Sequence, residues 1–227
     1  MLEKNFKQLC QNFSTQNSLI NQLWLEIKIS HNNPKRHYHT LVHLANIDKE
    51  RQKLRLSVQD NIIFQFATYY HDIIYDIEAK DNEEQSATLA KKRLAQLTVP
   101  KHIINEIYKL IILTKKHSKT DKITHAYFLD ADLAILGSSW DEYQQYTTQI
   151  RKEYGVYSDE IYNRGRKRVL EHFFNQEYIY QSEYFRNRYE KKARKNITKY
   201  LSKINFKKIG NDGFSLAIFG AKASDSI

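Results

Sequence analysis

Residues 61–77 read NIIFQFATYYHDIIYDI, and this stretch decides the fold that we predict. Apolar residues recur in it at steps of three and four, as they do on one face of a helix. The stretch also contains the pair His71-Asp72, and ionisable groups beside an apolar stripe are costly to bury unless each has a partner. We therefore expect a helix over 61–77 that carries a functional pair in its C-terminal part. The apolar face consists of Ile62, Ile63, Phe66, Ala67, Tyr70 and Ile74.

The same periodicity runs through most of the chain. It is clear in 84–97 and 102–114, and it predicts further helices at 16–29, 39–55, 140–153, 159–175 and 183–204. The 227 residues include only six glycines and two prolines, too few for the many turns of a sandwich or barrel. We predict an all-α helical bundle that forms a single domain over residues 1–206. Residues 207–227 hold three of the six glycines and no helical period, so we expect a loosely ordered C-terminal tail there.

The composition indicates where in the cell the protein acts and which partners its charge favours. The single cysteine, Cys10, cannot form an intramolecular disulfide. The N-terminus has no apolar stretch typical of a signal peptide, and the most apolar run, 102–114, is too short to span a bilayer. We expect a cytoplasmic protein without a membrane partner. The net charge of +10 fits either lysine-rich helix surfaces or a field that attracts phosphates or nucleic acid.

Three clusters of histidine and acidic residues are candidates for a functional site. His39 and His43 are four residues apart, a spacing that places both on one face of a helix and suits a metal or a phosphate. Six acidic residues between His71 and Glu84 oppose one lysine, which fits a cation site or a solvated acidic loop that caps the next helix. Asp130 and Asp132 lie in an apolar segment and, if it is helical, point about 200° apart, so only one faces a shared site.

Taken in order, these clusters resemble the HD superfamily of metal-dependent phosphohydrolases. The resemblance is closest to a bacterial group of uncharacterised, predicted HD phosphohydrolases, and it covers roughly residues 20–204. It implies an HD-domain helical bundle with additional C-terminal helices. The matching motifs are Arg36-His37-Tyr38-His39 with His43, Tyr70-His71-Asp72 with Tyr75-Asp76, Asn82-Glu83-Glu84 with Ser86-Ala87, Phe128-Leu129-Asp130-Ala131-Asp132-Leu133 with Leu136-Gly137, and, in the C-terminal half, Ile150-Arg151, Glu153-Tyr154, Gly165-Arg166, Tyr180, Glu190, Ala193-Arg194 and Asn196.

The resemblance implies that His43, His71, Asp72 and one carboxylate of the Asp130/Asp132 pair bind a divalent metal ion. We favour Asp132, because an Ala-Asp pair before leucine matches the family's last motif better; Asp130 is the alternative. Two histidines and two carboxylates suit Mn²⁺, Fe²⁺ or Co²⁺, and also Ni²⁺ or Mg²⁺. Such a set leaves a position open for water, unlike a structural zinc site.

One position departs from the family. Branches that hydrolyse nucleotides often have a glutamate three residues after the Asp of the His-Asp pair, and here that position is Tyr75. We assign catalytic roles to Asp72 and to Asp76, which would orient or deprotonate the attacking water. The alternative for Asp76 is a carboxylate that holds His71 or His43 in place.

On the substrate side we propose Arg36 and Arg151, because a guanidinium fork matches phosphate oxygens. We also propose His39, which would contact a phosphate; its alternative role is a structural hydrogen bond. Lys115, Lys116 and Arg166 could also bind phosphate, but we favour exposed surface positions for these three residues. His117 is a further candidate, either as a ligand of a second ion or as a cation near a helix end.

The sequence thus predicts a metal-dependent hydrolase of a phosphoester or phosphoanhydride, acting on a small, nucleotide-like substrate. Two alternatives stay open: a catalytically silent HD module that binds a metal or nucleotide for regulation, and a basic helical protein that binds nucleic acid. Ten lysines and arginines between Arg186 and Lys208, interleaved with tyrosines, would serve the second alternative or form an exposed helix face.

Overall fold

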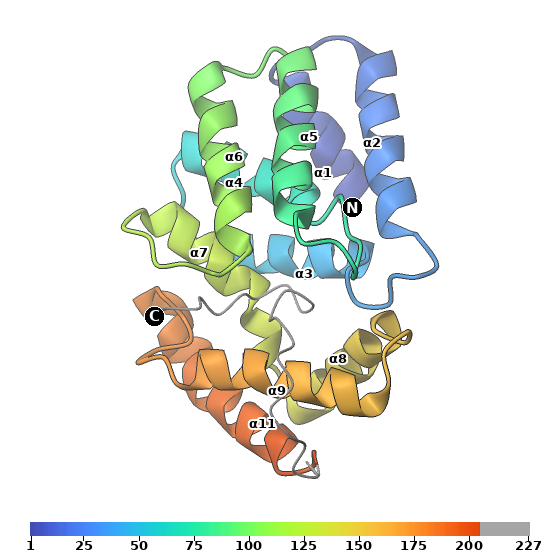
Figure 1. The fold of residues 1–227 in the computed structure, drawn as a ribbon. Helices are drawn as coiled ribbons and strands as arrows, with labels where there is room; N and C mark the ends of the chain where they lie inside the picture. The colour runs from blue at the N-terminus through green and yellow to red at the C-terminus, as the bar shows by residue number, and fades with distance from the viewer. Residues whose placement is uncertain (205–227) are drawn as a thin grey trace, which may run out of the picture. The chain divides into compact units, whose positions relative to one another are not determined.

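The computed structural model describes residues 1–204, so the predicted tail over 207–227 lies outside the described residues. Every regular element within 1–204 is helical and no strand occurs there (Figure 1). The prediction of an all-α protein is therefore confirmed. No helix in this part of the chain is long and apolar enough to cross a membrane.

The chain divides into two compact units. The first unit comprises Met1–Asp76 and Asp81–Thr114, and the second comprises Ile77–Lys80 and the chain from Lys115 onward. The single domain over 1–206 stays a prediction, because two compact units can still fold as one cooperative domain.

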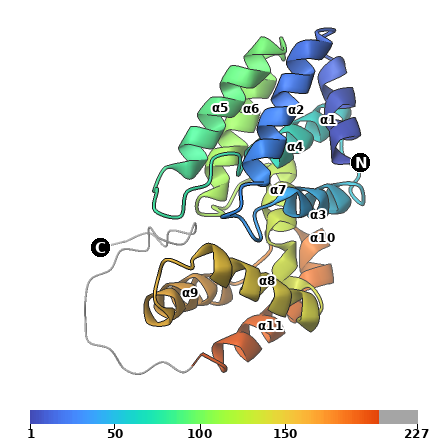
Figure 2. The same cartoon turned by 90° about the vertical axis from the view of Figure 1, so that its right-hand side faces the viewer.

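The first unit contains six helices. In it α4 packs against α6, and α5 and α6 lie side by side in both views of Figures 1 and 2. The turn between α5 and α6 contains Pro100, which cannot continue the preceding helix, and Thr98 with a left-handed φ of 59°. The helices are α1 (Leu2–Gln11), α2 (Asn17–His31), α3 (Leu41–Arg51), α4 (Val58–Tyr70), α5 (Asn82–Gln96) and α6 (Lys101–Thr114).

The core of this unit follows the predicted stripes. The apolar face of α6 is buried as expected, from Ile103 to Ile111. Helix α4 is buried on nearly all sides from Phe66 to Tyr70, which is typical of a helix in the centre of a helical layer. Helix α1 was not predicted, although Phe6, Leu9 and Cys10 are spaced for one buried face.

His31, the last residue of α2, is fully buried. Its Nδ1 lies 2.9 Å from the Ile27 carbonyl oxygen, and its Nε2 has no hydrogen-bond partner among the described residues. Burial, and next the nearby Arg36 guanidinium, lower the pKa of His31 to about 3. The imidazole is therefore neutral in the folded protein, while it titrates near its ordinary pKa in the unfolded chain.

The lowered pKa predicts a loss of stability in acid. Between about pH 6.5 and pH 3, His31 is protonated in the unfolded chain but stays neutral in the folded protein. By pH 4.5 this difference is expected to cost about 3 kcal/mol. Urea unfolding of His31→Leu at pH 7 and pH 4.5 should show a smaller acid-induced loss than the wild type. Equal losses in both proteins would contradict the prediction.

The second unit contains α7 (Ile123–Asp132), α8 (Trp140–Glu153), α9 (Asp159–Phe174), the short α10 (Glu183–Phe185) and α11 (Lys191–Leu201). The helix predicted at 140–153 is confirmed at both ends. Ser139 accepts a hydrogen bond from the Glu142 backbone N–H, and the Glu142 carboxylate accepts one from the Ser139 N–H. This capping box is a local signal, so the start of α8 can be read from sequence.

The helix predicted over 183–204 is confirmed from Glu183 to Leu201, but it is not a regular α-helix throughout. Residues Arg186–Glu190 form a π-helical turn between α10 and α11. At this turn the backbone of Gly137 approaches Tyr189 so closely that a Cβ on residue 137 would lie 2.6 Å from the Tyr189 Cβ. The Glu190 carboxylate also accepts hydrogen bonds from the backbone N–H groups of Ile179 and Tyr180. These long-range contacts fix the turn where local helical preference alone predicts a regular helix.

Candidate metal centre

His43 and His71 face each other inside the first unit. His43 lies in the first turn of α3, and His71 is the C-terminal cap of α4. Their Nε2 atoms are 3.3 Å apart, and the two residues are 3% and 1% exposed. The sequence prediction that these two histidines share a site is consistent with this geometry.

Asp72 adds a carboxylate to the same point. Its Oδ2 lies 3.0 Å from Nε2 of His71 and 3.8 Å from Nε2 of His43. The Asp72 side chain is 20% exposed, so the cluster is accessible from one side. Three potential metal-ligand atoms of the first unit thus converge within 4 Å of one another.

The environment of His71 sets which of its ring nitrogens carries the proton. Its Nδ1 lies 3.2 Å from the Thr68 carbonyl oxygen, which can only accept a hydrogen bond. On that assignment Nδ1 is protonated and Nε2 presents a lone pair to His43 and Asp72. A carbonyl behind a histidine in this way is the usual arrangement for a metal ligand. A lone pair, a carboxylate oxygen and a second imidazole nitrogen at such short separations are well suited to hold a cation.

Arg36 holds the segment that carries Asp72. Its guanidinium donates to the carbonyl oxygens of Asp72 at 2.6 Å, Ile73 at 3.0 Å and His39 at 3.2 Å, and to the Ser30 hydroxyl at 3.1 Å. Arg36 is only 8% exposed. These contacts give it a role in positioning Asp72; its predicted role in substrate binding stays a prediction.

The same contacts explain a correction to the predicted helix 61–77. Helix α4 ends at Tyr70, so Asp72 follows the helix and does not lie within it. The carbonyl oxygens of Asp72 and Ile73 accept hydrogen bonds from Arg36. The Ser86 hydroxyl oxygen accepts one from the backbone N–H of Ile74. Side chains from other segments therefore satisfy the backbone beyond Tyr70, and the chain leaves the helix there.

The predicted helical pairing of His39 and His43 is also wrong. Helix α3 begins at Leu41, after an N-cap at Thr40 whose side chain accepts from the Val42 N–H. His39 therefore precedes the helix, and its ring packs against Tyr75 with centroids 4.3 Å apart. It still lies near the cluster, with its centroid 5.7 Å from that of His43. A substrate contact from His39 stays a prediction.

Asp76 lies on the exposed side of the loop after the cluster. Its backbone is fixed by the Asn82 side chain, which accepts from the Asp76 N–H at 3.0 Å and donates to the Asp76 carbonyl oxygen at 2.7 Å. Asn82 and Ser86, both at the start of α5, thus anchor the loop that follows His71-Asp72. No signal within the His-Asp motif alone would have identified them as its supports.

In the second unit, Asp130 and Asp132 have different surroundings, as their spacing on a helix predicts. Asp130 is 1% exposed, and its carboxylate accepts from the N–H groups of Gln181 and Ser182, each at 2.7 Å, and from the Ser182 hydroxyl at 2.6 Å. Burial raises its pKa to about 6 despite these hydrogen bonds. Asp132 lies at the end of α7, with its Oδ2 3.1 Å from Nε2 of His117.

Arg151 organises the turn between α8 and α9. It donates to the Asp159 carboxylate at 2.8 Å and to the carbonyl oxygens of Tyr154 and Tyr157 at 2.9 and 3.0 Å. Its predicted contact with substrate stays a prediction, and these bonds supply a structural reason for an arginine at this position.

No protein-family model, curated protein or solved structure matches this chain.

Proposed function

We propose that the protein is a metal-dependent hydrolase of a phosphoester or phosphoanhydride. The observation that carries the proposal is the convergence of His43 Nε2, His71 Nε2 and Asp72 Oδ2 at separations of 3.0 to 3.8 Å in the first unit. Three buried or partly buried groups of this chemistry would be a poor arrangement without a cation among them.

The donor set favours Mn²⁺, Fe²⁺, Co²⁺, Ni²⁺ or Mg²⁺ with water in the remaining positions. A structural zinc site normally uses cysteine ligands, and Cys10 is buried in the core at α1. When bound, such an ion lowers the pKa of a water and polarises a phosphoryl oxygen.

Other residues of the chain hold the proposed ligands in place and act on the attacking water. Thr68 holds the His71 ring through its carbonyl oxygen, and Arg36 holds the backbone of Asp72. We assign to Asp76 the role of accepting a proton from the attacking water or orienting it. The substrate of the proposal is a small, phosphorylated, nucleotide-like molecule, drawn to a chain with a net charge of +10.

Asp132 completes the ligand set that we propose, on the strength of the resemblance to the HD superfamily. The alternative, Asp130, has both carboxylate oxygens engaged with residues 181 and 182. Its hydrogen bonds favour a structural role and so support the choice of Asp132.

Asparagine substitutions at three aspartates test these assignments. Asp132→Asn is expected to lower metal affinity by more than about tenfold, because even outer contacts of a ligand set change affinity by that much. Asp130→Asn should keep its metal but lose about 2 kcal/mol of stability, because an amide N–H would face the donors of Ser182. Asp76→Asn should keep metal and stability and lose turnover. Metal content by mass spectrometry, urea unfolding and phosphatase assays measure the three effects.

Each variant has an outcome that removes its assignment. Metal loss in Asp130→Asn with a normal Asp132→Asn would exchange the two roles, and a normal rate in Asp76→Asn would remove Asp76 from the chemistry. A wild-type protein that binds no divalent ion would remove the proposal itself. A metal-loaded protein that is inactive on aryl phosphates and nucleotides would favour the regulatory module instead.

A further inference from the structure

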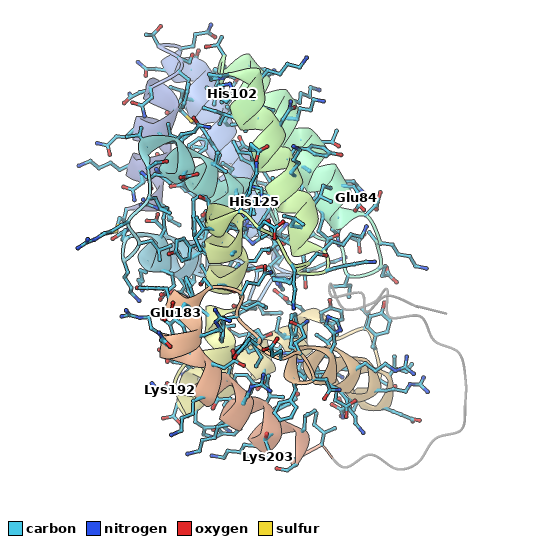
Figure 3. All side chains as sticks on the ribbon, turned by 90° about the vertical axis from the view of Figure 1, so that its left-hand side faces the viewer. Glu84, His102, His125, Glu183, Lys192 and Lys203 are labelled. Atoms are coloured by element: carbon cyan, nitrogen blue, oxygen red, sulfur yellow. The ribbon has the colours of Figure 1, made fainter. Side chains whose placement is uncertain are left out.

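The exposed side of α11 carries a continuous stripe of positive charge. Residues 191–204 contain five lysines, one arginine and no acidic residue. Four of these lysines recur at steps of three and four along α11 and the turn after it, so they share one face. All four are exposed, and none forms an ion pair with a carboxylate of residues 1–204. We call this set, Lys192, Lys195, Lys199 and Lys203, the lysine stripe; Figure 3 labels its first and last members.

Another face of α11 packs into the second unit. Ala193, Asn196 and Ile197 are buried, and the Asn196 amide donates to the carbonyl oxygens of Leu136 and Ser138. These contacts hold the helix in one orientation, with the lysine stripe toward solvent. Like charges at this spacing repel each other and destabilise a helix. A bound polyanion would remove this repulsion.

Two arginines of the same unit are used within the fold instead. Arg194 forms an ion pair with Glu190. Arg166 is only 6% exposed and donates to the Tyr146 hydroxyl at 2.7 Å. The surface position favoured for Arg166 from sequence is therefore wrong. The lysine stripe differs from both arginines, because its charges face solvent and have no carboxylate partner among residues 1–204.

An indole ring lies beside the C-terminal half of the lysine stripe. The Nζ atoms of Lys199 and Lys203 lie 3.9 and 4.8 Å from the centroid of the Trp140 ring. The Tyr143 ring stacks on Trp140 with centroids 5.8 Å apart and so holds the indole in place. Both lysine side chains are exposed, and they can leave the ring when a planar group stacks there. Trp140 therefore offers a supported aromatic platform next to a row of cations.

Trp140 also lines a pocket of about 410 Å³ within the second unit. Amide and hydroxyl side chains contribute to its wall, among them those of Gln144, Thr148 and Asn163, and no acidic residue does. Such groups can donate to and accept from the edge of a nucleobase. Ammonium groups along a track and an aromatic ring beside it are the features with which proteins bind unpaired nucleotides.

Other anionic partners fit this surface less well. Stable binding to a membrane uses apolar side chains as well as charge, and no large apolar side chain of residues 183–204 is exposed. An acidic peptide could pair with the lysines but would make no use of the indole ring and the pocket. A nucleic-acid duplex keeps its bases stacked on one another and presents none to Trp140.

We propose that the lysine stripe and Trp140 bind single-stranded nucleic acid, with phosphates on the lysines and a base stacked on the indole. The stripe extends over about 17 Å of helix, enough to contact several phosphates of one strand. The surface lies wholly in the second unit and needs no metal ion. The proposal therefore goes beyond the hydrolase function and does not depend on it.

Binding of a labelled oligothymidylate of about 12 nucleotides to the full-length chain tests the proposal. Fluorescence anisotropy at several salt concentrations measures it, with a chelator present to remove any contribution from the proposed metal centre. Affinity should fall as salt rises, because phosphate contacts release counterions. Replacing both Lys195 and Lys199 by glutamine should weaken binding about tenfold and lower the slope of log K against log salt by about 1.4.

Two lysines of the first unit supply the matched control. Lys91 and Lys92 are exposed residues of α5, and replacing both by glutamine removes the same charge from the chain. This control should bind the oligothymidylate as the wild type does, with the same salt dependence. All four substitutions are at exposed helix positions, where changes in stability are small.

The stacking contact has a readout of its own. The chain has two tryptophans, so Trp24→Phe leaves Trp140 as the only one. Its emission should fall as oligothymidylate is added, because a base stacked on an indole quenches it. Four results would each overturn the proposal. They are no binding by the wild type in chelator, equal effects of the two double variants, unchanged Trp140 emission at saturation, and binding as tight to a duplex, to polyglutamate or to phosphatidylserine vesicles.

Discussion

Replacing His71 by alanine is expected to remove the divalent ion and to lower phosphatase turnover by about a thousandfold or more. The imidazole supplies the atom that lies closest to both other ligand candidates, 3.3 Å from His43 Nε2 and 3.0 Å from Asp72 Oδ2. Without it the proposed ion would keep only part of its ligand set, and the proposed activation of water would be lost with the ion. Metal content per chain and turnover of an aryl phosphate, measured on the same preparation, check both effects.

His102→Ala is the matched control. His102 is an exposed histidine at the start of α6 (Figure 3), so its loss should leave metal content and turnover unchanged and stability within about 0.5 kcal/mol. A His71→Ala protein that is folded and retains metal and rate would show that His71 is structural. The proposed function would then fail at its first residue.

Arg36→Lys is expected to have the largest effect on stability, a loss of about 2–4 kcal/mol. A lysine cannot reproduce the planar set of donors that reaches the carbonyl oxygens of His39, Asp72 and Ile73. Because these bonds hold the segment that carries Asp72, metal affinity should also fall by about tenfold. Urea unfolding and metal titration of the same protein measure the two quantities.

Arg55→Lys provides the comparison, because Arg55 is an exposed arginine of the same unit. It should change stability by no more than about 0.5 kcal/mol and leave metal affinity unchanged. If Arg36→Lys instead raised only KM, with stability and metal affinity intact, Arg36 would be a substrate-binding residue, as we predict from the sequence.

Helices whose ends depend on local chemistry could be predicted from the sequence. The start of α8 follows from Ser139 and Glu142, which cap the helix within one turn. The end of α4 could not be predicted in this way, because it depends on a contact that is distant in sequence. Arg36, 36 residues away, donates a hydrogen bond to the carbonyl oxygen of Asp72. The periodic pattern continues past Tyr70, and only the tertiary contact shows that the helix does not.

In the candidate site, too, some residues could be predicted from the sequence and others could not. The histidines and aspartates of the candidate metal centre were predicted because their order and spacing resemble a known family. Thr68 and Ser30, which support His71 and Arg36, are residue types with many structural uses, so nothing in the sequence marks them. The burial of Arg166 was missed for a related reason, since the tyrosines around it come from positions 143, 146 and 162 on two different helices.

The contact between Gly137 and Tyr189 limits how this chain can diverge. Any side chain at position 137 would collide with the backbone and Cβ of Tyr189, with approaches of 2.6 to 3.0 Å. A descendant that acquires alanine there must therefore straighten or relocate the turn at Arg186–Glu190, and with it the register of α11. Substitutions at these two places are expected to arise together during evolution, and their joint inheritance would mark which lineages retain this arrangement of the second unit.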